Sequence, residues 1–312
     1  MDAGMITGSD VDLADSVALV TGSTNGIGRE TAIRLADQGS TVIVTGRDEA
    51  RGSEVVERIR AAHPAADAEL FLADLADQDA VPELARQIRQ DYDRLDLLLN
   101  NAGTWQGKRR TTDDGIELTF AVNHLAPFLL TNCLAPLLRE SAPARVVTVS
   151  SGLHRNADLD LETVAERPDY DGRQAYSESK LANVLFTYEL AHRLDGTGVS
   201  AFAAHPGAIP ETSLAREAGG LSKLVWNAFA YLPDVLVGGV FGGVEDGAET
   251  VCYAATSPDL DGATGEYVAD CERARSSDAS YDEELQTGLW ELSAELTGLP
   301  AAVPDVDPLA EN

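Results

Sequence analysis

Short apolar runs rich in β-branched residues alternate with longer amphipathic segments along most of the chain. The runs cover residues 16–20, 41–45, 69–73, 95–99, 145–149, 199–204 and 265–269. Segments with apolar residues at helical spacing cover residues 29–38, 49–62, 81–92, 116–138, 174–194, 247–255 and 285–296. Strands that are buried on both faces and alternate with helices form parallel sheets. We therefore expect an α/β fold with a doubly wound parallel sheet and helices on both faces.

A single domain is expected from residue 16 to residue 299. Residues 1–15 are polar and acidic, which predicts a flexible N-terminal segment, and residues 300–312 are expected to form a loose acidic tail. Between residues 208 and 246, glycine pairs interrupt apolar pieces that contain Trp226 and other aromatic residues. An irregular stretch of this length is typical of a substrate loop or lid. Its aromatic side chains could pack in the core or lid, or they could line an apolar substrate pocket.

Composition excludes several classes of partner. The 312 residues include 52 acidic and 23 basic ones, which gives a net charge of −29 and argues against nucleic acid or anionic membrane as partners. No apolar stretch predicts a membrane span, and no basic-then-apolar leader follows Met1. The three cysteines are widely spaced and form no C-x-x-C pattern. We therefore expect no metal site and a cytoplasmic location.

A glycine-rich segment, Thr21 to Gly28, joins the first predicted strand to the first predicted helix. Glycines let the backbone turn tightly and approach a pyrophosphate, and the helix offers free N–H groups and the positive end of its dipole. Such a loop alone could be a plain tight turn. At the first strand–helix junction of a doubly wound chain it predicts a dinucleotide site, as in the Rossmann fold. The residues expected to bind the cofactor here are Gly22, Ser23, Asn25, Gly26, Ile27 and Gly28.

The end of the second predicted strand bears on the choice of dinucleotide. NAD sites usually carry a carboxylate there that binds the ribose 2′-hydroxyl. This strand ends in Gly46, and Arg47 follows. Arg47 could bind a 2′-phosphate through charge-assisted hydrogen bonds, or it could be a solvated charge beside Asp48, which would cap the next helix. We favour NADP over NAD.

Tyr176 and Lys180 are four residues apart in a predicted helix, so they lie on one helical face. Lys180 is one of only three lysines, against 20 arginines. A phenol has a pKa of ~10. A lysine charge about 4 Å away contributes on the order of 4 kcal/mol at an effective dielectric constant of ~20 as an upper figure. We expect Lys180 to lower the pKa of Tyr176 by about one to three units, toward the range useful for acid–base catalysis.

With the glycine loop and Asn100-Asn-Ala-Gly103, this Tyr-x-x-x-Lys pair makes the chain resemble the short-chain dehydrogenase/reductase family from about Ser16 to Leu299. Within that family the chain is most similar to the retinol-dehydrogenase-like branch. The segments that carry this similarity are residues 123–131, 176–183, 269–271 and 289–293.

The resemblance implies roles for particular residues. Tyr176 would be the catalytic acid and base, and Ser151 would hold the substrate oxygen. Lys180 would contact the nicotinamide ribose, and Asn123 would connect Lys180 to water. The further cofactor contacts that it implies, besides Tyr176 and Lys180, are Asp74, Leu75, Asn101, Ala102, Gly103, Pro206 and Gly207. The resemblance also suggests a homodimer or homotetramer.

Two features depart from the family pattern. A threonine or serine usually follows the proline of the nicotinamide-side loop after five residues, but Glu211 occupies that position here and Thr212 comes one later. Ser151 and Tyr176 are 25 residues apart, and the polar insert 154–173 between them could form the rim of the substrate pocket.

These features together predict an NADP(H)-dependent oxidoreductase that interconverts an alcohol and a carbonyl compound, with a small apolar molecule as substrate. Two alternatives stay open. The chain could be a catalytically inactive regulator that binds NADP, although such proteins usually lack the tyrosine or the lysine. It could also be a sugar-nucleotide epimerase or dehydratase, although Asn100-Asn-Ala-Gly103 and the short C-terminal region argue against this.

The acidic residues are spread along the whole chain, which predicts adaptation to a cytoplasm of molar salt. There the Debye length falls to about 3 Å, so that crowded carboxylates repel one another little. At low salt the same charge should destabilise the compact state. We expect thermal melts to show a higher Tm in molar KCl than in dilute buffer. Equal melting temperatures would contradict the salt adaptation.

Overall fold

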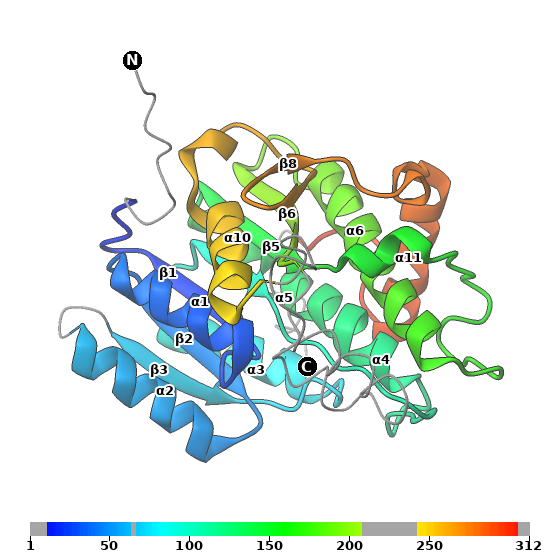
Figure 1. Cartoon of the computed structure of the whole chain (residues 1–312), viewed down its shortest axis with the longest axis horizontal. Coiled ribbons are helices and arrows are strands. Elements are labelled where there is room, and N and C mark those ends of the chain that lie inside the picture. Colours follow the sequence, from blue (N-terminus) through cyan, green and yellow to red (C-terminus); the bar gives the residue numbers. More distant parts are fainter. Residues whose placement is uncertain (1–10, 64–66, 208–241, 305–312) are drawn as a thin grey trace, which may run out of the picture.

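A computed structural model of the chain describes residues 11–63, 67–207 and 242–304. Its centre is an eight-stranded sheet in the order β3-β2-β1-β4-β5-β6-β7-β8 (Figure 1). Every neighbouring pair is parallel except β7 and β8, which are antiparallel. The strands are β1 (Val17–Thr21), β2 (Thr41–Gly46), β3 (Ala68–Leu72), β4 (Leu97–Asn100), β5 (Ala144–Val149), β6 (Val199–His205), β7 (Glu266–Ala269) and β8 (Glu272–Ala274).

Helices cover both faces of this sheet, which confirms the predicted doubly wound α/β fold (Figure 1). The helices are α1 (Gly26–Asp37), α2 (Glu49–Ala62), α3 (Ala80–Asp91), α4 (Leu118–Phe120), α5 (Ala126–Glu140), α6 (Gly172–Arg193), α10 (Val244–Thr256) and α11 (Glu283–Thr297). The apolar side chains of α1, α2 and α10 form one core with one face of the sheet. Those of α3, α5, α6 and α11 form the core on the opposite face.

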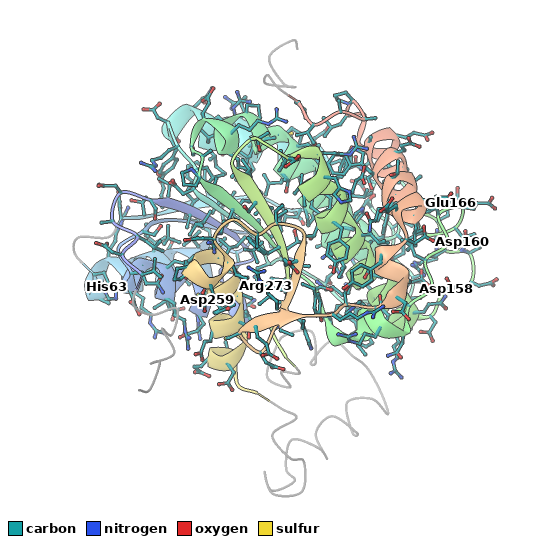
Figure 2. The ribbon with its side chains drawn as sticks, turned by 90° about the horizontal axis from the view of Figure 1, so that it is seen from above. His63, Asp158, Asp160, Glu166, Asp259 and Arg273 are labelled. Atoms are coloured by element: carbon teal, nitrogen blue, oxygen red, sulfur yellow. The ribbon has the colours of Figure 1, made fainter. Side chains whose placement is uncertain are left out.

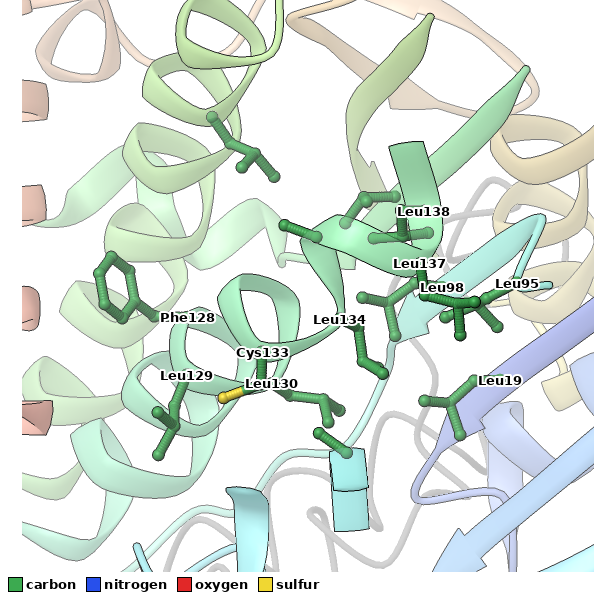
Figure 3. Packing of buried hydrophobic residues seen from close by; sticks show 14 of the residues in the cluster. Leu19, Leu95, Leu98, Phe128, Leu129, Leu130, Cys133, Leu134, Leu137 and Leu138 are labelled. Atoms are coloured by element: carbon green, nitrogen blue, oxygen red, sulfur yellow. The ribbon is translucent and has the colours of Figure 1, made fainter. Parts of the chain in front are cut away.

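The most apolar helical segment runs from α4 through a π-helical turn, Ala121–Leu125, into α5. The segment Leu118–Glu140 is long and apolar enough to cross a membrane, but 94% of its most apolar window is buried inside the protein. Figure 3 shows α5 leucines, including Leu134 and Leu137, packed beside Leu19 and Leu98 of the sheet. Its apolar composition is therefore that of a core helix.

The C-terminal helix α11 closes the outer side of α5 and α6. Trp290 is buried between Phe128 of α5 and Phe186 of α6, with ring centroids 4.8 Å and 5.8 Å away. The guanidinium of Arg193 lies over the Trp290 ring, 4.5 Å from its centroid. Aromatic pairs and cation–π contacts of this kind stabilise a packed face beyond the area that they bury.

The chain beyond α11 is fixed as far as residue 304, so the expected loose tail does not begin at residue 300. The Ala301 carbonyl accepts hydrogen bonds from Trp290 and Arg193, and the Pro304 carbonyl accepts one from Arg139. At the other end, the Leu13 N–H donates to the Gln38 carbonyl, which places residue 13 against the domain. Residues 1–10 and 305–312 of the two predicted terminal segments lie outside the described residues, as do residues 208–241 of the predicted lid.

The insert between Ser151 and Tyr176 is anchored by a buried pair. Arg167 and Glu178 are 6% and 4% exposed and form an ion pair, and Leu159 and Val164 are buried beside α6. The acidic side chains of this insert point away from the molecule, as Figure 2 shows for Asp158, Asp160 and Glu166.

Two elements differ from the expectations. Strand β8 was missed because two of its three residues, Glu272 and Arg273, are charged and exposed, so no apolar alternation marks it. It pairs with β7 through a two-residue turn in which Asp270 and Cys271 have φ values of 51° and 57°. The third strand ends at Leu72 rather than at residue 73, so Asp74 lies in the turn after β3.

Candidate active site

The residues predicted for the site follow the carboxyl ends of neighbouring strands. The glycine loop follows β1, Asn101 to Gly103 follow β4, and Ser151 follows β5. Tyr176 and Lys180 come from α6, which packs against β5 and β6. Because all these strands are parallel, the loops meet at one edge of the sheet, where ligands bind in doubly wound folds.

The loop between β1 and α1 is folded as a close-packed cradle. Gly22 and Gly26 have φ values of 67° and 55°, a conformation that suits glycine. A Cβ atom on Gly22 would lie 2.9 Å from the Cα of Ala102, and one on Gly28 would overlap the Asn101 side chain. A side chain at either position would therefore clash with its neighbours. Without side chains there, the backbone can come close to a ligand.

Thr21 ties this loop to the segment after β4. Its Oγ1 accepts hydrogen bonds from the N–H groups of Asn101 and Ala102, at 2.9 Å and 3.0 Å. The Asn101 side chain returns a hydrogen bond to the Thr21 carbonyl at 2.8 Å. Asn100 points the other way and donates to Thr131 of α5. The Asn-Asn-Ala-Gly segment thus sets the position of the glycine loop relative to the sheet.

The residues present fit a dinucleotide. Helix α1 has no acidic residue in its first turn, and its N-cap residue Asn25 makes no side-chain capping bond. Its free N–H groups can therefore bind an anion. Ser23 is buried and holds the loop to β2, because its Oγ donates to Val20 and accepts from Thr45.

Arg47 lies beside this cradle, directly after β2. It is exposed, and it makes no ion pair with another residue of the described segments. Its neighbour Asp48 caps α2 by accepting from the Arg51 N–H at 3.1 Å and pairs with the Arg51 side chain. The nearest acid in the sequence is thus already occupied, which leaves Arg47 available to an anionic group.

Tyr176, Ser151 and Lys180 come together as predicted. Tyr176 is 8% exposed, and the Ser151 side chain is close enough to its hydroxyl to lower the pKa of the phenol. Ser151 Oγ also accepts from the Leu153 N–H at 3.3 Å. Lys180 is buried, donates to the Val149 carbonyl at 2.9 Å, and lies 5.7 Å from the centroid of the Tyr176 ring. These three groups form one polar cluster at the end of β5, in which Tyr176 and Lys180 are buried and Ser151 is partly exposed.

The expected lowering of the Tyr176 pKa by Lys180 is wrong for the protein's own groups. Burial raises the pKa of Tyr176 to about 12, and its hydrogen bond with Ser151 offsets only part of this rise. Burial also lowers the pKa of Lys180 to about 8. Removal of both groups from water outweighs their mutual interaction. At neutral pH the phenol is therefore protonated, and the ammonium form of Lys180 still predominates.

Asn123 contributes in a different way from the one expected. It lies in the π-helical turn and is fully buried, and its Oδ1 accepts from the Thr104 N–H at 2.7 Å. Both of its N–H groups are also used, one on the Thr104 carbonyl and one on Ser179 Oγ. The side chain thus fixes the segment after Gly103, and the link between Lys180 and water stays a prediction.

Sequence reasoning missed Trp105. Its indole stacks on the Tyr176 ring, with centroids 4.9 Å apart and planes inclined by 17°. The stack buries the ring that carries the reactive hydroxyl. The position could have been noticed from its place two residues after Gly103, but no periodic pattern marks it.

The remaining predicted contacts are placed as follows. Asp74 is exposed and Leu75 is half-buried against the core, in the turn after β3. Gly207 has a φ of 84°, and its N–H donates to the His205 ring at the end of β6. Glu211 and Thr212 lie outside the described residues.

Comparison with known proteins agrees with this geometry. The family model described as short chain dehydrogenase matches residues 16–220. Retinol dehydrogenase 14 of Mus musculus is 37% identical over 314 residues, covering 96% of this chain and 88% of that protein.

Solved structures are similar as well. An uncharacterised protein from Mycobacterium paratuberculosis is 31% identical, with a TM-score of 0.76 and coverage of 96% of this chain and 98% of that one. A short chain dehydrogenase from Escherichia coli CFT073, complexed with NADPH, is 26% identical with a TM-score of 0.63, covering 83% of this chain and 98% of that one.

The stack of Trp105 on Tyr176 leads to a test by pH. Replacing Trp105→Ala should expose the phenol and lower its pKa, because burial is the main cause of the raised value. If Tyr176 acts as a base in alcohol oxidation, kcat should then begin to rise at lower pH than in the parent. Trp105→Phe, which can keep an aromatic stack, is the matched control. An unchanged pH profile of kcat for Trp105→Ala would show that the stack does not set the phenol's pKa.

Proposed function

Because the chain belongs to the short-chain dehydrogenase family and is an oxidoreductase acting on CH–OH donors, we propose that it interconverts an apolar alcohol and its carbonyl compound with NADP(H). The observation that carries this proposal is the cluster of Tyr176, Ser151 and Lys180 beside the glycine loop. The two alternatives have less support. A regulator that binds NADP without catalysis would not need the acid–base cluster. Among the described residues of the site, no feature favours a sugar nucleotide as the substrate.

In carbonyl reduction, Tyr176 supplies the proton. Its phenol is neutral at pH 7 because its pKa is raised, so the hydroxyl can donate to the oxygen of the substrate. Ser151, which contacts the same hydroxyl, provides a second donor that stabilises the developing negative charge. The Lys180 ammonium lies over the ring, 5.7 Å from its centroid, so its positive charge offsets part of the burial cost of the phenolate left after the transfer.

NADP(H), when bound, supplies or accepts the hydride. The glycine loop and the N-terminus of α1 would hold its pyrophosphate, and Arg47 would bind its 2′-phosphate. Thr21 and Asn101 keep this cradle in place against the sheet. A similar structure named as complexed with NADPH supports the choice of cofactor.

An apolar substrate is proposed from the surroundings of Tyr176. The indole of Trp105 presents an aromatic surface next to the reactive phenol. The relatives named retinol dehydrogenases also support an apolar alcohol as the substrate class. We keep a cytoplasmic location and a homodimer or homotetramer as parts of the proposal.

Tyr176→Phe tests the mechanism. The variant should lose turnover of a panel of ketones, aldehydes and alcohols, measured in molar KCl with NADPH or NADP, because phenylalanine lacks the hydroxyl that transfers the proton. Cofactor affinity, measured by fluorescence titration with NADPH, should persist. Turnover at the parent rate would refute the role of Tyr176, and a parent enzyme inactive on the whole panel would refute the proposed function.

Arg47→Ala tests the cofactor. Loss of charge-assisted hydrogen bonds to the 2′-phosphate should raise the KM for NADPH by roughly tenfold or more and spare the KM for NADH. Arg58, an exposed arginine further along α2, provides the matched control, since Arg58→Ala should change neither value. Equal effects of Arg47→Ala on both cofactors would contradict binding of the 2′-phosphate.

A further inference from the structure

His154 joins the serine of the active site to a distant part of the chain. It lies in the 3₁₀ turn Gly152–Asn156, directly after Ser151, and its side chain is fully buried. Its Nδ1 lies 2.6 Å from the Ser151 carbonyl oxygen, and its Nε2 lies 3.0 Å from the backbone nitrogen of Ser277. The two ring nitrogens thus bridge segments that are more than one hundred residues apart in sequence.

The two partners determine the tautomer of the ring. The Ser277 N–H can only donate, so Nε2 must accept and carries no proton. The Ser151 carbonyl can only accept, so the proton must be on Nδ1. If the ring were positively charged, both of its nitrogens would carry a proton, so Nε2 could not accept the hydrogen bond from the Ser277 N–H.

The surroundings favour this neutral ring. The pKa of His154 is lowered to about 4, mainly by burial and further by the nearby Arg155 and His205. The ring also packs on Tyr267 of β7, with centroids 5.1 Å apart. At neutral pH, His154 is therefore uncharged and held in one orientation.

The segment that His154 reaches is itself rigid. We call residues 275–281 the C-terminal arm. Ser276 Oγ forms hydrogen bonds with Tyr188 of α6 and with Ser280, both at 2.6 Å. The Arg155 side chain donates to the carbonyls of Ser276 and Arg275 and lies over the ring of Tyr267. The arm can therefore act as a fixed support for the turn that carries Ser151.

We propose that His154 is a positioning residue for Ser151, and that it holds the Ser151 backbone against the C-terminal arm so that the serine hydroxyl keeps its contact with Tyr176. Ser151 has an extended backbone, with φ −154° and ψ 150°, and lies between a strand and a turn. Its carbonyl is fixed by His154 while its Oγ faces Leu153 and Tyr176. The inference rests on the proposed function, since it assigns a role within the same site.

Ser277 offers a direct test, because its contribution is a backbone N–H. Its φ of −73° suits proline, so Ser277→Pro removes the donor to His154 while the local backbone is kept. Ser277→Ala is the matched control: it keeps the N–H, and the Ser277 hydroxyl has no hydrogen-bond partner among the described residues. His154→Phe removes both bonds and keeps a ring against Tyr267.

Ser277→Pro and His154→Phe should lower kcat by about tenfold or more, because small displacements of a reacting group have effects of this size. The KM for NADPH should stay near the parent value, and Ser277→Ala should behave as the parent. Partial unfolding would also lower the apparent kcat at an unchanged KM, so thermal melts must show that each variant is folded at the assay temperature. Parent-like kcat in both folded variants would overturn the proposal.

A second measurement does not depend on activity. Nitrogen NMR of ¹⁵N-labelled protein reports which ring nitrogen of His154 carries the proton, and Ser277→Pro should shift the Nε2 signal alone. A proton on Nε2 in the parent would refute the bridge. If the parent reduces no carbonyl compound in the panel, the proposed function is refuted. The NMR assignment of the ring proton would still show whether His154 bridges Ser151 and Ser277.

Discussion

The hydrogen bond from the buried ammonium of Lys180 to the Val149 carbonyl joins helix α6 to the end of the central sheet. A buried charge without a partner would be costly, so this contact fixes where α6 can lie. Two more bonds strengthen the same joint, from Asn183 to Val149 and from Ser150 to the Lys180 carbonyl. The positions of Tyr176, one helical turn earlier, and of Ser151, two residues after Val149, both follow from it.

Much of the fold could be predicted from the sequence, because buried parallel strands and covering helices leave periodic apolar patterns such as those of β1 and α2. The glycine loop and Tyr176-x-x-x-Lys180 were equally readable, since spacing alone brings their residues together. Trp105 and the placement of residues 301–304 were not, because they depend on contacts between distant segments, and β8 was not, because two of its three residues are exposed charges. The direction of the Tyr176 pKa shift was also mispredicted. The distance between the phenol and the ammonium can be estimated from helical spacing, but the burial that raises the pKa depends on the complete fold.

The acidic side chains of the insert lie away from the buried site because of the way the insert is attached to α6. Arg167 turns inward to Glu178, which also accepts a hydrogen bond from Gln174, while the acids around Arg167 face solvent. A buried pair of this kind contributes more to a defined arrangement than to net stability. The high negative charge is thus carried on the exterior, and the groups near Tyr176 are held mainly by neutral hydrogen bonds.

The position of Trp290 has a consequence for how the chain acquires its structure during synthesis. The apolar faces of α5 and α6 are covered by α11, a helix that the ribosome makes well after α6. Until those residues emerge, the helix that carries Tyr176 and Lys180 keeps part of its apolar surface in water. The sheet can begin to assemble on the ribosome, but α6 is fully packed only after α11 has also emerged.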